Sequence, residues 1–169
     1  MGRILFVILL LLPGGVYATP ADDYVILGNS ALQRMDVVAA MVAFTQALDE
    51  NPKHAEAAYQ RGRILLKINE PQKAIIDFTT AVLNNPSHGR ALARRGEAKI
   101  VLKDWVAAFA DFDAAVRMSP QDYEVFVVRA TYRFKRGELG FAISDMESAI
   151  AVADPATAAT LQAMLQRMK

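Results

Sequence analysis

The 169-residue chain contains no cysteine and only two histidines. The absence of cysteine excludes disulfides, thiol nucleophiles and cysteine-ligated zinc or iron–sulfur sites. Lys and Arg number 19 against 18 Asp and Glu, so the chain lacks the basic excess of proteins that bind nucleic acid through its phosphates. Nine glycines and seven prolines are too few for a disordered chain. These deficits favour a compact, helical protein that does not bind nucleic acid.

Catalytic motifs are missing as well. The sequence has no GxSxG, P-loop, HExxH or Gly-rich nucleotide loop. None of its serines has a histidine in a recognisable catalytic setting, and we expect its carboxylates at helix starts and on solvated faces. We therefore predict that the protein is not an enzyme and that it has no cofactor and no metal.

Residues 1–18 have the layout of a secretory signal peptide of the bacterial type. Arg3 gives a positive start, nine apolar residues follow from Ile4 to Leu12, and Val16 and Ala18 lie three and one places before the expected cleavage after Ala18. Nine residues of helix rise only about 14 Å, against roughly 30 Å of membrane hydrocarbon. We predict an exported protein, periplasmic or secreted, with no stable membrane span after cleavage. An uncleaved N-terminal tether is the alternative.

A period of 34 residues organises the remaining domain, residues 19–169. The same residue types recur at this interval in six columns, each over three or four copies. Four of these columns are Pro52, Pro86 and Pro120; Ala40, Ala74, Ala108 and Ala142; Phe44, Phe78 and Phe112 with Met146; and Gly28, Gly62 and Gly96 with Ala130. Such regular recurrence indicates an array of structural repeats.

Each copy is predicted to form two helices, over residues 21–54, 55–88, 89–122 and 123–155. In the first copy, the spacing of Tyr24 and Gly28 marks one helix, and Ala40, Phe44 and Ala47 make one stripe on the next. An acidic residue precedes every second helix, where it complements the positive end of the helix dipole. These residues are Asp36, Glu70, Asp104 and Glu138.

The segment 155–168 is predicted to form a last helix, with Asp154 as its N-cap and Pro155 in its first turn. Four apolar residues share one face, which we expect to cover the open end of the fourth repeat. They are Leu161, Met164, Leu165 and Met168. The opposite face is polar, as a solenoid cap requires. A partner-binding amphipathic helix is the alternative.

The pattern resembles the tetratricopeptide repeat (TPR) family, whose 34-residue helix–turn–helix unit has this small and large residue arrangement and a closing proline. The resemblance covers residues 21–155. It implies an all-α TPR solenoid of four repeats with a capping helix. The fourth copy departs from the pattern with Ala130 in place of Gly and Met146 in place of Phe.

Two further sets of columns carry charge. Arg61, Arg95 and Arg129 occupy one column and Asp77, Asp111 and Asp145 another, whereas the first copy has Leu27 and Ala43 at these places. This joint presence and absence predicts a structural charge pair between the two helices of a repeat. The histidines His54 and His88 also share a column, which we interpret as a solvated turn because no acidic column accompanies it there.

The resemblance implies that the first helices line a concave groove in which a peptide binds. The residues expected to contact it are Asn29, Tyr59, Gln60, Arg63, Arg90 and Arg94. The arginines make an acidic or carboxylate-ended segment a reasonable ligand. We therefore expect a protein–protein interaction adaptor. The alternative is a structural assembly subunit that oligomerises through its open repeat edges; the sequence leaves the oligomeric state open.

Overall fold

A computed structural model describes residues 19–168, and within this range the chain forms α-helices joined by short turns, without a strand. The signal peptide predicted for residues 1–18 lies outside the described residues. The helices are α1 (Pro20–Gln33), α2 (Val37–Glu50), α3 (Ala55–Lys67), α4 (Pro71–Asn84), α5 (Gly89–Val101), α6 (Trp105–Met118), α7 (Tyr123–Lys135), α8 (Leu139–Val152) and α9 (Pro155–Met168). Helices α1 to α8 pack as four consecutive hairpins, and none of the described helices is long and apolar enough to cross a bilayer.

The acidic residues before the second helices differ in whether they cap the helix, and the difference follows the length of the side chain. The shorter Asp36 and Asp104 cap their helices, accepting hydrogen bonds from the backbone N–H groups of Ala39 at 2.9 Å and Ala107 at 3.1 Å. Glu70 and Glu138 occupy the same place without a side-chain cap bond. Aspartate at this place therefore caps the helix, whereas glutamate acts on the helix dipole without capping.

Glycine in the first helix and phenylalanine in the second are matched in shape. A Cβ atom added at Gly28 would lie 2.5 Å from Cε1 of Phe44, which is fully buried. The second and third repeats have the same contact between glycine and phenylalanine. In the fourth repeat Ala130 carries that Cβ, and the ring is replaced by the flexible side chain of Met146. The two departures of the fourth copy are therefore one coupled change.

The predicted charge pair is confirmed, and it also links neighbouring repeats. Arg61 donates from Nε and Nη2 to the two carboxylate oxygens of Asp77, both at 2.8 Å, and its Nη1 lies 3.5 Å from the hydroxyl of Thr45 in the preceding repeat. The third and fourth repeats repeat this arrangement. In them the arginines Arg95 and Arg129 bond Asp111 and Asp145, and reach back to Thr79 at 3.2 Å and Asp113 at 2.8 Å.

This geometry explains why the first copy lacks both partners. The arginine joins three helices, the last of which belongs to the preceding repeat, and no described helix precedes α1. Leu27 takes its place and is 57% exposed. The column pattern thus marks the first repeat as the edge of the array.

Helix α9 covers the fourth repeat with three of the four residues of its predicted apolar face, because Met168 is half-buried against the core beside Leu161 and Leu165. Leu161 and Leu165 are buried, and Asp154 caps the helix as predicted, accepting from the N–H groups of Ala156 and Thr157 at 3.1 Å. Met164, however, is 43% exposed. The predicted covering of the fourth repeat is therefore confirmed for three of the four residues, and Met164 stays outside the contact because α9 packs mainly on α8.

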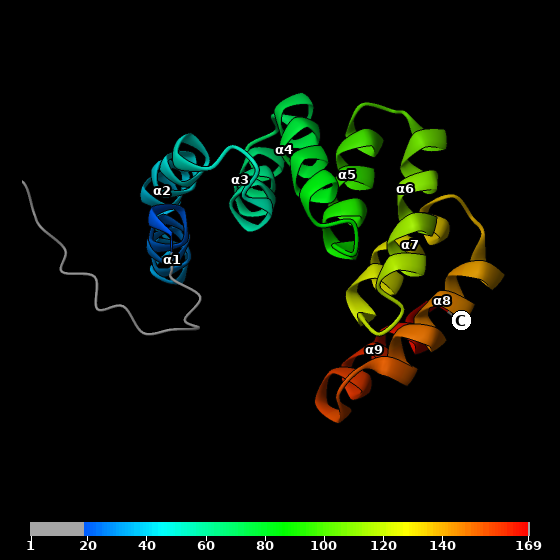
Figure 1. The fold of residues 1–169 in the computed structure, drawn as a ribbon. Helices are drawn as coiled ribbons and strands as arrows, with labels where there is room; N and C mark the ends of the chain where they lie inside the picture. The colour runs from blue at the N-terminus through cyan, green and yellow to red at the C-terminus, as the bar shows by residue number, and fades with distance from the viewer. Residues whose placement is uncertain (1–18, 169) are drawn as a thin grey trace, which may run out of the picture.

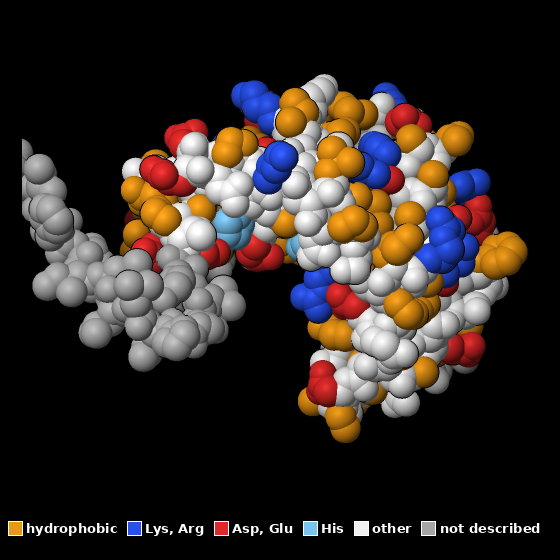
Figure 2. Space-filling view, viewed as in Figure 1, with side chains coloured by type: hydrophobic (Ala, Val, Ile, Leu, Met, Phe, Trp, Pro, Cys, Tyr) orange, Lys and Arg blue, Asp and Glu red, His pale blue; other side chains and the backbone are white. Residues whose placement is uncertain are grey.

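The repeats stack along an arc (Figure 1). Within residues 19–168, first helices of successive repeats contact one another at α3–α5 and α5–α7, whereas successive second helices make no comparable contact. The first helices therefore lie on the inner side of the curve. We call their inward surface the concave face; Figure 2 shows it as a hollow with the histidine side chains at its border.

Candidate functional site

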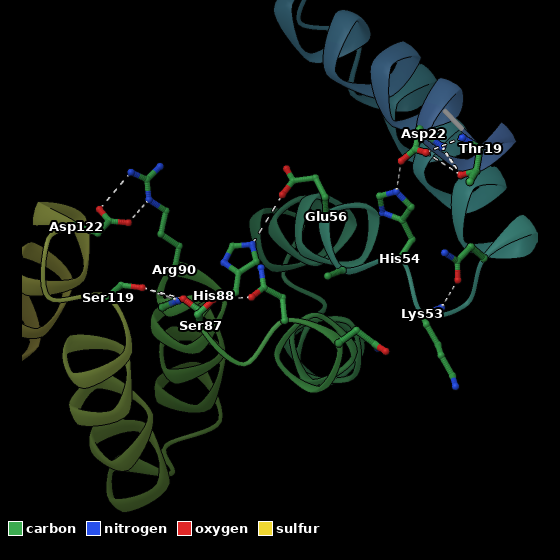
Figure 3. A pocket seen from close by; sticks show the side chains of 15 residues that line it. Thr19, Asp22, Lys53, His54, Glu56, Ser87, His88, Arg90, Ser119 and Asp122 are labelled. Atoms are coloured by element: carbon green, nitrogen blue, oxygen red, sulfur yellow. Dashed lines mark hydrogen bonds and ion pairs between the residues drawn. The ribbon is translucent and has the colours of Figure 1, made fainter. Parts of the chain in front are cut away.

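The N-terminal ends of the first helices meet at a polar pocket of about 640 Å³ on the concave side (Figure 3). Each junction between repeats is bridged there by residues 32 positions apart. Asp22 faces His54 at 3.0 Å and Glu56 faces His88 at 3.8 Å. At the third junction Arg90 donates to Asp122, with Nη2 3.2 Å from Oδ1. We call these three pairs the junction ladder.

The histidines of the ladder also cap helices. Nδ1 of His54 accepts from the N–H of Ala57 at 3.2 Å, and Nδ1 of His88 accepts from that of Ala91 at 3.3 Å. Because Nδ1 accepts, Nε2 carries the proton and can donate to the facing carboxylate. The side chain of His54 is only 15% exposed, so the interpretation of a solvated turn was wrong. Its acidic partner is Asp22 in the first turn of α1, 32 residues earlier, rather than a residue of the same turn.

Because of Asp22, the junction ladder makes the stability of the fold depend on pH in the acidic range. Hydrogen bonds from His54 and Thr19 lower the pKa of Asp22 from 3.8 to about 2, because they stabilise the charged carboxylate. The stabilisation is complete above the ordinary pKa and is lost as the pH falls toward 2. We expect the urea midpoint of the wild type to fall between about pH 4 and pH 2, and this fall to be smaller in Asp22→Asn. Parallel curves for the two proteins would contradict the prediction.

Along the concave face, the side chains predicted for the second repeat are joined in one network. The guanidinium of Arg63 donates to Gln60 Oε1 at 2.7 Å, and Gln60 Nε2 donates to Glu56 Oε1 at 2.6 Å. Arg63 also lies over the ring of Tyr59, 5.6 Å from its centroid, and that ring is 4.4 Å from the ring of His88. Three of the predicted groove residues therefore lie together. They contact the junction ladder through Glu56 and His88.

Arg90 and Arg94 are already paired with carboxylates of this chain. Arg90 contacts Glu124 at 3.1 Å in addition to Asp122, whose hydrogen bonds raise the pKa of Arg90. Arg94 contacts Glu97 at 2.6 Å and lies 4.0 Å from Glu124. A carboxylate ligand would have to compete with these acids for either arginine.

Two cations near Arg94 have no acidic partner among the described residues. Within residues 19–168, Arg63 and Lys67 make no ion pair, and they line a pocket of about 300 Å³ together with Arg94 and Glu97. Asn29 is half-buried on α1 and lines neither this pocket nor the polar one. The structure thus gathers Tyr59, Gln60 and Arg63 near Arg94 and leaves Asn29 apart.

The side chains gathered on the concave face are hydrogen-bonding and charged groups. No group of three or more potential metal ligands is found among the described residues. Every fully buried side-chain nitrogen or oxygen in residues 19–168 has a hydrogen-bond partner. Hydrogen-bond donors and a few cations on a helical face are suited to holding an extended polar segment.

Comparison with known proteins shows a likeness in fold. The model of the tetratricopeptide repeat family matches residues 31–95, and no curated protein matches the chain by sequence. A thermophilic TPR protein in Thermus thermophilus is similar in structure, with a TM-score of 0.74 and 23% identity over 86% of this chain and 80% of that one. The MamA protein is similar with a TM-score of 0.63 and 20% identity over 78% of this chain and 72% of that one.

A peptide complex is also among the similar structures. The second TPR of Spaghetti, bound to the HSP90 peptide SRMEEVD, has a TM-score of 0.56 and 26% identity over 58% of this chain and 91% of that one. The fold of the present chain is an all-α TPR solenoid, as the repeat columns predict.

Proposed function

We propose that this protein is a non-enzymatic interaction scaffold that binds a peptide segment of a partner protein on its concave face. The observation that carries the proposal is the network on the concave face in which the exposed Arg63 bonds Gln60 and lies over the buried ring of Tyr59, beside the half-buried Arg94. Support comes from the similarly folded TPR of Spaghetti, whose structure holds a peptide. TPR folds serve typically as interaction scaffolds, which agrees with the absence of catalytic motifs in the sequence.

The ligand favoured by this face is an acidic or carboxylate-ended segment. Arg63 and Lys67 make no ion pair within the described range and are exposed, so a carboxylate can reach them without displacing an acid of this chain. Arg94 can then exchange Glu97 for the ligand. Charge-assisted hydrogen bonds from guanidinium groups to carboxylates are among the strongest polar contacts in proteins.

A displayed peptide library with free C-termini tests the proposal. The tightest peptide selected is resynthesised with free and amidated ends and titrated by calorimetry. We expect Arg63→Ala and Arg94→Ala to weaken binding about 10- to 100-fold, the loss of one or two charge-assisted hydrogen bonds. Arg117→Ala, an exposed arginine on the second helix α6, is the matched control and should bind as the wild type does. Equal affinity of all four proteins would reject the concave face.

The second candidate is an assembly subunit, and the first repeat supplies the observation that favours it. Leu27 and Ile26 on α1 are 57% and 63% exposed at the edge where the column of arginines is interrupted. A second copy could cover this apolar edge. Mass in solution decides: a concentration-independent monomer rejects assembly, and a dimer abolished by Leu27→Asp supports it.

We also propose that the protein is exported, on the pattern of residues 3–18 in the sequence. Expression of the full chain in a bacterium tests this. A mature protein outside the cytoplasm whose mass corresponds to residues 19–169 would support export with cleavage. A full-length mass in the membrane fraction would support the tether, and a full-length cytoplasmic protein would reject both.

A further inference from the structure

At the far end of the concave face lies an apolar pocket of about 320 Å³ between α7, α8 and α9. Four apolar residues from these three helices line it, namely Phe134, Met146, Met164 and Met168. Phe134 is 47% exposed and Met164 43% exposed, so both present apolar surface to the opening. The volume is at the lower limit for pockets that hold small ligands, and three methionines give the walls an adaptable shape.

The pocket lies beside the coupled change in the fourth repeat. In the other three repeats a phenylalanine ring fills the space against a glycine, whereas here Met146 stands opposite Ala130 and itself lines the cavity. On α9, Leu161 and Leu165 are buried in the core and Met168 packs against it in part, and Met164 and Met168 also form the cavity wall.

Two cations border the pocket. Lys135 and Arg167 line it and are exposed, and within residues 19–168 neither makes an ion pair. The ammonium of Lys135 lies 4.5 Å from the ring centroid of Tyr132, which holds it at this end of α7. Arg90 and Arg94, by contrast, are already paired with carboxylates of this chain.

We propose that this pocket receives the C-terminal residue of the bound peptide. An apolar side chain such as leucine enters between the methionines, and the terminal carboxylate pairs with Lys135 and Arg167. An apolar side chain and a carboxylate belong to one and the same residue of a peptide only when that residue is apolar and C-terminal. The inference rests on the proposed function and adds the direction in which the peptide runs along the concave face. Its C-terminal residue lies at α7 and α9, and the preceding acidic residues lie toward Arg63.

The methionine methyl groups provide the test. The full protein is labelled with [¹³C-methyl]methionine and titrated with acetyl-Gly-Gly-Leu carrying a free carboxylate, with its amide, and with octanoate. We expect the free acid to shift the signals of Met146, Met164 and Met168 and to bind at least 5-fold more tightly than the amide. Signals of Met35 and Met41, which lie in the first repeat, are internal controls.

Every other outcome of the titration overturns the proposal. Equal binding of acid and amide removes the carboxylate contact. Shifts confined to the first repeat, or no shift at millimolar peptide, remove the pocket. Tighter binding of octanoate than of the peptide identifies a small amphiphile as the occupant in place of a C-terminus.

Two variants separate the pocket from the rest of the groove. Ala130→Gly with Met146→Phe restores the pattern of the other repeats and should abolish the shifts at Met164 and Met168, while thermal unfolding reports whether it folds. Lys135→Gln with Arg167→Gln changes only exposed side chains and should remove the preference for acid over amide. If the library peptide binds both variants as it binds the wild type, the pocket assignment fails and the concave-face scaffold stands. If Arg63→Ala is also without effect, the proposed function fails.

Discussion

Replacing Arg61 with methionine is expected to lower the free energy of unfolding by about 3 kcal/mol, the lower part of the range for removing one partner of a buried ion pair. The carboxylate of Asp77 is only 5% exposed and Arg61 is the one cation within ion-pair distance of it among the described residues. Methionine preserves much of the apolar stem, so the loss reports the charge that is left unpaired. Equilibrium unfolding in urea measures it.

The third repeat supplies the internal comparison for this prediction. Asp111 is held by Arg95 and also by Lys99, whose Nζ lies 2.7 Å from Oδ2. Arg95→Met leaves one cation in place, so we expect less than half of the loss seen for Arg61→Met. Removing both partners with Arg61→Met and Asp77→Leu should recover most of the stability, because no buried charge then remains. Equal losses at positions 61 and 95 would show that a lone buried carboxylate is not the cause.

Contacts within one repeat could be predicted from the sequence. The joint presence of Arg61 with Asp77, and the joint absence of both types at Leu27 and Ala43, indicated a pair whose members lie 16 residues apart on adjoining helices. Such pairs depend on the geometry of a single hairpin, which the 34-residue pattern specifies. The reach of the arginine to Thr45 in the preceding repeat was not visible, because threonine recurs only in two copies and changes to Asp113 in the third.

Contacts between repeats were harder to predict because they depend on how the repeats stack. The partner of His54 is Asp22, 32 residues earlier, and the equivalent junction in the third step exchanges the charges between Arg90 and Asp122. A comparison of these two columns with each other would have found the ladder, since each junction has an acid in one column and a base in the other. The pocket beside Met146 also depends on stacking, and the sequence showed only that the fourth copy departs from the pattern.

The second large effect is expected from Gly28→Ala. The added Cβ would lie 2.5 Å from the ring of Phe44, and its three nearest atoms all belong to that ring. A buried ring cannot turn away, so we expect a loss of about 1–3 kcal/mol from overpacking, which outweighs the gain of up to about 1 kcal/mol in helix propensity. The double variant Gly28→Ala with Phe44→Met copies the fourth repeat and should regain most of the loss in urea unfolding.

Gly140→Ala in α8 is the matched control, because a Cβ there meets nothing within 4 Å; it should be stabilising by up to about 1 kcal/mol. If Gly28→Ala behaves like this control, glycine and phenylalanine are not a matched pair.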